Sequence, residues 1–145
     1  MTETTASLGS DEENVVAEML AAYRDAWDSA DADAFAALFT ADATYVIFLG
    51  DALIGRDAIR DNHRDVFTKW QAGTKLAVRS VTTRKVGADV LSVLTVGGIG
   101  VDPDAITLDK FQTFVLARED ATWKIAAFQN TSMADWNIAR HNARG

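Results

Sequence analysis

The chain has 145 residues, a formal net charge of −7 at pH 7 and 48% hydrophobic residues, and it contains no cysteine. A chain of this length forms one domain with its own hydrophobic core. The missing cysteines exclude disulfides, thiolate nucleophiles and cysteine metal sites, and the negative charge argues against nucleic acid or an anionic membrane as a partner.

The start of the chain is polar and acidic, and no apolar run approaches the length of a membrane span. We therefore expect a cytoplasmic protein without a secretory signal. Residues 1–9 are short polar side chains without periodicity, which predicts a disordered N-terminus. Ser10 followed by Glu13 is a capping-box pattern and predicts that the first helix begins there.

Two further helices are predicted in the first half of the chain. Asp31 or Asp33 can cap a short second helix, and the pattern leaves both residues open. A third helix is predicted from Arg56 to Trp70, where apolar residues recur at helical spacing. Exposed aspartates alternate with the arginines of this helix and predict a surface laced with ion pairs.

The second half of the chain changes to the alternating pattern of strands. Residues 97–105, which contain the only proline, are predicted to form a flexible loop, and residues 134–145 a tail that is either a short helix or an arm. A single domain should therefore occupy residues 10–133. The predicted strands cover residues 44–49, 52–54, 75–86, 89–96, 107–117 and 122–132.

Helices followed by meandering strands predict an α+β fold, and the lack of alternation between helices and strands excludes a Rossmann arrangement. We expect a cone-shaped, curved antiparallel sheet packed on three helices from the N-terminal half. Such a cup encloses a hydrophobic pocket, and an apolar pocket with a few polar groups is a typical small-molecule site.

Three segments carry a family resemblance. Residues 31–39, 55–59 and 123–131 resemble the nuclear-transport-factor-2-like and SnoaL-like superfamily, and the last segment is similar to the SgcJ/EcaC subfamily of enediyne and related polyketide pathways. The resemblance spans roughly residues 12–132. It implies a homodimer whose pocket, between sheet and helices, takes a hydrophobic polyketide-like ligand.

Ketosteroid isomerases of this superfamily carry a carboxylate base on the first strand and a tyrosine on the first helix. The resemblance places Tyr23 at a position similar to that tyrosine and Ile47 at the position of the base. Isoleucine cannot accept a proton, so the isomerase mechanism of these relatives is not supported.

His63 is the candidate proton-transfer residue, because its helical spacing places it on the apolar stripe with Ile59 and Phe67. Tyr23 is its candidate catalytic partner. The alternative for His63 is an ordinary core histidine with a hydrogen bond. His141, near the chain end, is expected in solvent. Two distant histidines without flanking ligand residues predict no metal site, and no cofactor motif is present.

A set of aromatic, apolar and amide side chains is expected to bind the ligand, with core packing and cross-strand hydrogen bonding as the alternative. Strand alternation allows only one of Gln129 and Asn130 to face inward, and the choice stays open. The complete set is Trp27, Tyr45, Ile47, Phe67, Trp70, Gln112, Gln129 and Asn130.

Three functions remain open at this point. The first is a cofactor-independent cyclase, dehydratase or isomerase of specialised-metabolite biosynthesis. The second is a non-catalytic protein that binds and sequesters a polyketide intermediate. The third is a protein–protein interaction module.

Overall fold

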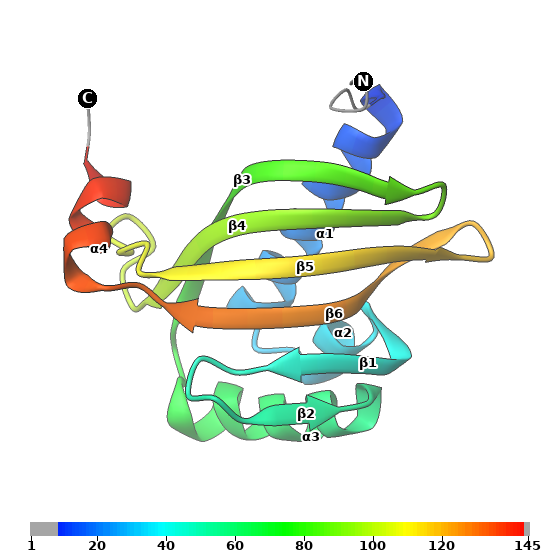
Figure 1. The fold of residues 1–145 in the computed structure, drawn as a ribbon. Coiled ribbons are helices and arrows are strands. Elements are labelled where there is room, and N and C mark those ends of the chain that lie inside the picture. Colours follow the sequence, from blue (N-terminus) through cyan, green and yellow to red (C-terminus); the bar gives the residue numbers. More distant parts are fainter. Residues whose placement is uncertain (1–8, 144–145) are drawn as a thin grey trace.

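A computed structural model describes residues 9–143 of the chain, so the predicted disorder of residues 1–8 lies outside the described part. The order of elements confirms the mixed α+β class (Figure 1). The elements are α1 (Ser10–Asp28), α2 (Ala32–Ala36), β1 (Phe39–Val46), β2 (Ala52–Ile54), α3 (Arg56–Asp65), the π-helix η1 (Val66–Trp70), β3 (Lys75–Gly87), β4 (Val90–Gly100), β5 (Lys110–Glu119), β6 (Thr122–Ser132) and α4 (Asp135–Asn142).

The six strands form one curled sheet in the order β2-β1-β6-β5-β4-β3. Neighbouring strands are antiparallel except β1 and β6, which run parallel. Helices α1, α2 and α3 cover one face of the sheet, behind the strands in Figure 1. The expected cup of a curved sheet on three helices is confirmed. Within residues 9–143, no helix is long and apolar enough to cross a membrane.

The ends of the first two helices depend on local side-chain contacts. The N–H of Gly9 donates to the carboxylate of Glu12 at 2.8 Å, so the cap lies one residue before the predicted Ser10. The carboxylate of Asp31 accepts from the Ala34 N–H at 3.0 Å, and Asp31 rather than Asp33 therefore caps α2.

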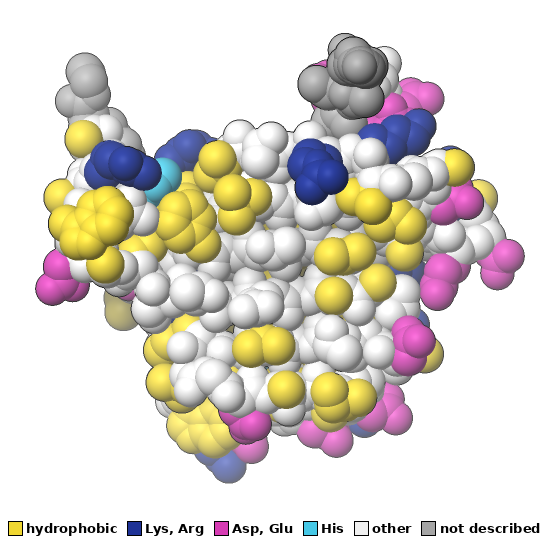
Figure 2. Space-filling view, in the orientation of Figure 1, with side chains coloured by type: hydrophobic (Ala, Val, Ile, Leu, Met, Phe, Trp, Pro, Cys, Tyr) yellow, Lys and Arg dark blue, Asp and Glu magenta, His cyan; other side chains and the backbone are white. Residues whose placement is uncertain are grey.

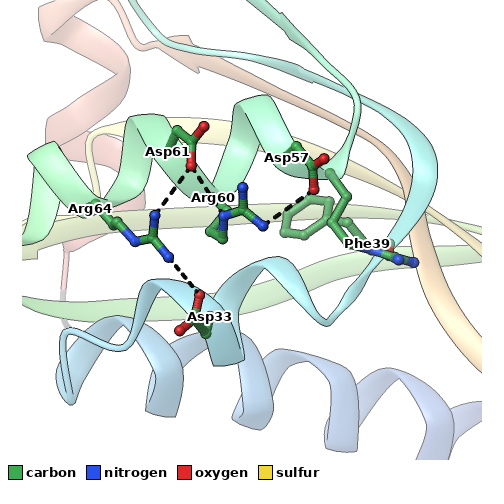
Figure 3. A network of polar contacts seen from close by, with 7 residues as sticks. Asp33, Phe39, Asp57, Arg60, Asp61 and Arg64 are labelled. Carbon is green, nitrogen blue, oxygen red and sulfur yellow. Dashed lines mark hydrogen bonds and ion pairs between the residues drawn. The ribbon is translucent and has the colours of Figure 1, made fainter.

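The arginines of α3 have two different roles (Figure 3). Arg56 donates from Nε and Nη2 to the Phe39 carbonyl at 2.9 and 2.7 Å, which ties the helix to β1. The other arginines form the predicted surface ion pairs at 3.1 to 3.4 Å, each of which contributes little to stability because it is solvated. These pairs join Arg60 to Asp57 and Asp61, and Arg64 to Asp61 and Asp33.

Helix α2 is short, but its Phe35 lies at the centre of the core and is fully buried. Its ring lies 5.0 Å from Tyr23 of α1, 5.4 Å from Phe39 of β1 and 4.3 Å from His63 of α3, measured between centroids. One side chain thus holds two helices and a strand in place. Replacing a buried phenylalanine of this kind with alanine typically costs about 3–5 kcal/mol.

The C-terminal tail forms the short helix α4, which docks against the end of the sheet. The side chain of Asn142 accepts from the Leu108 N–H and donates to the Leu108 carbonyl, both at 2.8 Å. The His141 ring lies edge-on to Phe111 at 5.1 Å and is partly buried. The expectation that His141 lies in solvent is therefore wrong, because α4 packs on the sheet.

The convex face of the sheet is open. Figure 2 shows hydrophobic side chains and uncharged white surface, which includes backbone, over its centre, whereas charged side chains lie mainly at its margins. Thr113 of β5 and Gln129 of β6 are paired on this face and are both exposed. The centre of this convex face is therefore uncharged and accessible within this chain.

Candidate functional site

A cavity of about 620 Å³ lies between the concave face of the sheet and the helices α1, α3 and η1. The register of the strands builds its wall in rows, since residues directly opposite each other on neighbouring strands share a face. One row is aromatic and the next along the strands is polar. The aromatic row contains Phe114, Phe128 and Tyr45, and the polar row contains Thr95, Gln112 and Asn130.

The aromatic row marks the buried end of the cavity, which Tyr45 and Phe128 border while the fully buried Phe114 lies behind them. Tyr45 stacks on Phe128 with ring centroids 4.3 Å apart, and Phe114 meets Phe128 edge-on at 5.0 Å. Tyr23 reaches this row from α1 and lies 5.1 Å from Phe114 and 5.7 Å from Phe128. The rings therefore offer a flat apolar surface against which an aromatic or unsaturated ligand can pack.

Two buried hydroxyls lie together at this end. The Tyr23 and Tyr45 hydroxyl oxygens are 3.1 Å apart and form a hydrogen bond. Burial raises the pKa of Tyr45, and burial together with the neighbouring Tyr45 raises the pKa of Tyr23 well above its usual value. Both phenols consequently stay protonated at neutral pH. A hydroxyl pair shares one hydrogen bond, so one proton remains for a ligand oxygen.

His63 borders the same end of the cavity and is only 2% exposed. Its Nδ1 lies 2.8 Å from the Ile59 carbonyl, which can only accept, so Nδ1 carries the proton. Burial lowers the pKa of His63 to about 4, although the bond to Ile59 opposes this effect. The ring is therefore neutral at pH 7. Its Nε2 carries no proton and has a lone pair that can accept one. The core-histidine and functional interpretations both fit this placement.

The mouth of the cavity is polar and aromatic. Trp70 borders it from the π-helix and is 61% exposed; π-helical turns often occur at functional sites. Lys110 also borders the cavity, and its Nζ lies 5.0 Å from the Phe48 ring centroid and 2.9 Å from the Asp109 carboxylate. Asp109 is thus an ion-pair partner that is partly exposed, which does not favour an acid–base role.

The SnoaL-like domain family matches residues 16–135. The chain belongs to this family. No curated protein matches the chain.

Solved structures place the SnoaL-like domain among cystatin-like and NTF2-like folds. A domain of unknown function with a cystatin-like fold from Nostoc punctiforme is 23% identical and covers 92% of this chain and 85% of its own, with a TM-score of 0.80. An NTF2-like protein of unknown function from Pseudomonas putida is 12% identical, with coverages of 89% and 92% and a TM-score of 0.75. A protein described as a candidate scytalone dehydratase from Novosphingobium aromaticivorans is 16% identical, with coverages of 85% and 85% and a TM-score of 0.72. At these identities the likeness shows the fold alone.

Most residues predicted for the site of this SnoaL-like domain border the cavity, but two do not. Phe67 is buried beside the cavity wall and packs edge-on against Trp27 at 5.1 Å. Gln129 is exposed on the convex face, because alternation turns Asn130 inward. The predicted residues that border the cavity are Tyr23, Trp27, Tyr45, Ile47, His63, Trp70, Gln112 and Asn130.

The sequence reasoning missed several residues of the wall, among them Phe48, Lys110 and Phe128. Phe128 lies two positions before Asn130 on the same strand, so the two share a face by alternation. Knowing that Asn130 faces inward would have identified Phe128. Phe48 lies in the turn after β1 and Lys110 is the first residue of β5, and the pattern carried no comparable signal at either position.

Residues 97–100 belong to β4, so the predicted flexible loop there is wrong. A Cβ on Gly98 would lie 1.9 Å from the Thr107 carbonyl oxygen, and one on Gly97 would lie 3.0 Å from the Gln112 amide. Gly98 therefore leaves room for the Thr107 backbone, and Gly97 leaves room for the Gln112 side chain.

Across residues 9–143, no three His, Asp or Glu side chains gather in a group that could hold a metal ion.

Proposed function

We propose that this SnoaL-like domain is a cofactor-independent acid–base enzyme acting on a flat, polyketide-like intermediate of specialised metabolism, of the enediyne type that the sequence resembles. The reaction is a cyclisation, dehydration or isomerisation. One observation carries the proposal: a protonated hydroxyl pair, Tyr23 and Tyr45, and a neutral imidazole, His63, border the same apolar end of one cavity.

Dehydration of a β-hydroxy ketone illustrates the chemistry. Nε2 of His63 accepts the proton next to the carbonyl, and the electron pair of that C–H bond forms a C=C bond. The C–O bond breaks as a tyrosine hydroxyl donates its proton to the leaving hydroxide, which departs as water. The proton on His63 then returns to the tyrosinate, so the site is restored and no external acid, base or oxidant is consumed.

The rival function is non-catalytic binding of such an intermediate. Ile47 borders the cavity at the position that resembles the carboxylate base of the isomerases, and the low basicity of His63 weakens it as a base. Both observations support a protein that holds a ligand without converting it. A purely protein–protein module has less support, because the cavity is not filled by its own side chains.

A simple trial substrate separates the two functions. 3-Hydroxy-1-tetralone is a flat β-hydroxy ketone that loses water to give fluorescent 1-naphthol. The enzyme proposal predicts 1-naphthol formation above the buffer rate, with a loss of about 100-fold or more in His63→Gln, as expected for a general base. His141→Gln, a histidine outside the cavity, is the matched control and should retain activity. Saturable quenching of tryptophan fluorescence without any 1-naphthol would instead support the binding protein.

We further propose that the protein is a cytoplasmic homodimer that pairs through the convex face of the sheet. The uncharged centre of that face supports this arrangement, since a partner there would bury no isolated charge (Figure 2). Thr113→Arg places a charge at the centre of the face. Light scattering should report a dimer for the wild type and a monomer for the variant; a monomeric wild type would refute the proposal.

A further inference from the structure

The polar row of the cavity wall is a directed chain of hydrogen bonds across three strands. Thr95 of β4 lies directly opposite Gln112 of β5, and Gln112 lies directly opposite Asn130 of β6. Thr95 is fully buried and Gln112 is 8% exposed. Buried amides must satisfy donors and acceptors separately, so the direction of each bond in the row is determined by its neighbours.

Thr95 sets that direction. Its Oγ1 lies 2.7 Å from the side-chain oxygen of Gln112 and 3.4 Å from the Gln112 backbone carbonyl. A hydroxyl has one proton, and the much shorter distance makes the side chain its acceptor. The Gln112 oxygen therefore faces Thr95, and its Nε2 faces Asn130, where it donates to Oδ1 at 3.3 Å.

The chain of hydrogen bonds ends at Asn130, whose side-chain nitrogen Nδ2 is not used within it. Asn130 borders the cavity, and its Nδ2 has no hydrogen-bond partner among residues 9–143. Gly97 keeps the arrangement possible, since a Cβ there would lie 3.0 Å from both polar atoms of the Gln112 amide. The row thus ends, beside the cavity, in an amide nitrogen whose two N–H groups are both unused within residues 9–143.

We infer that Asn130 binds a carbonyl oxygen of the ligand, and that Thr95 and Gln112 are positioning residues that turn its N–H group towards that oxygen. The inference rests on the proposed function only in taking the cavity as a small-molecule site. It narrows the ligand class to flat molecules that carry a ketone or quinone oxygen. Asn130 lies one strand repeat, about 7 Å along β6, from Phe128 of the aromatic row.

Two matched probes test the inference: 1-tetralone, which has the carbonyl, and tetralin, which lacks it. Binding is measured by fluorescence of Trp27 and Trp70, which border the cavity. Asn130→Leu should weaken 1-tetralone roughly fivefold, the value of one hydrogen bond, and leave tetralin unchanged. Gln129→Leu makes the same substitution on the convex face and should change neither affinity.

Thr95 is tested by two variants of different chemistry. Thr95→Val removes the hydroxyl at nearly constant shape and should weaken 1-tetralone roughly twofold to threefold, whereas Thr95→Ser keeps the donor and should restore the wild-type affinity. The carbonyl stretch of bound 1-tetralone should shift to higher frequency in Thr95→Val and Asn130→Leu. A structural defect alone would not produce this spectroscopic shift.

The outcomes distinguish this inference from the proposed function. A carbonyl preference that survives Asn130→Leu but disappears in Tyr45→Phe would overturn the inference and assign the oxygen to the tyrosine pair. A preference that depends on Asn130 supports the inference even if 3-hydroxy-1-tetralone is never converted, a result that would remove only the enzymatic function. Failure of wild-type protein to bind 1-tetralone would overturn both.

Discussion

The buried imidazole of His63 should make the folded protein sensitive to acid. Its pKa is about 4 in the folded state, against 6.5 for the ordinary side chain. A histidine whose pKa is lowered by folding binds fewer protons in the native state than in the unfolded state, so stability falls as pH falls. The loss begins near pH 6.5 and levels off below pH 4. Between pH 7.5 and 4.5 these two values correspond to about 2 to 3 kcal/mol.

Urea unfolding at pH 7.5 and at pH 4.5 measures this loss of stability. Carboxylates also titrate over this interval, and their contribution is subtracted by measuring His63→Gln under the same conditions. The wild type should lose about 2 to 3 kcal/mol more than His63→Gln over that interval. His141→Gln controls for the other histidine and should behave like the wild type. The reasoning is refuted if wild type and His63→Gln lose stability equally, or if NMR titration of the His63 ring gives a midpoint near 6.5.

Three further predictions concern the cavity wall. Gly98→Ala puts a methyl 1.9 Å from a backbone carbonyl oxygen and should lower Tm by roughly 6–12 °C, whereas Gly87→Ala, which meets nothing within 4 Å, should leave Tm nearly unchanged in calorimetry. Tyr23→Phe and Tyr45→Phe should each cost about 1 kcal/mol in urea unfolding, and the double variant less than their sum; strict additivity would contradict the hydroxyl pair. Trp70→Ala should weaken 1-tetralone several-fold at little cost in stability, because the side chain is 61% exposed; unchanged affinity would exclude Trp70 from the binding surface.

Features that depend on neighbouring residues were predictable from the sequence. The bounds of β6 were predicted correctly as residues 122–132, because a turn and an alternating pattern define them locally. Asp31 was one of two candidate caps, and it is the one that precedes α2 in the structure. The cup itself followed from the order of helices and strands, which limits how apolar faces can be covered.

Features that depend on distant residues were not predictable. Whether Gln129 or Asn130 faces the cavity depends on the pairing of β6 with β1 and β5, and the β1 partner lies far away in the sequence. The change from α-helix to π-helix at Val66 turns Phe67 into the core and leaves Trp70 at the mouth. No local sequence pattern predicts the change from α-helix to π-helix, because it results from tertiary packing.

The parallel pairing of β1 with β6 has a consequence for how the chain reaches its fold. β6 is the strand that joins the first hairpin, β1 and β2, to the meander of β3, β4 and β5. During synthesis at ordinary elongation rates, several seconds pass between the emergence of β1 and that of its partner β6. The apolar faces of α1 and α2 remain uncovered for that interval. We expect truncation before residue 122 to yield aggregating fragments that chaperones retain, and mutations in β6 to lower cellular yield more than activity.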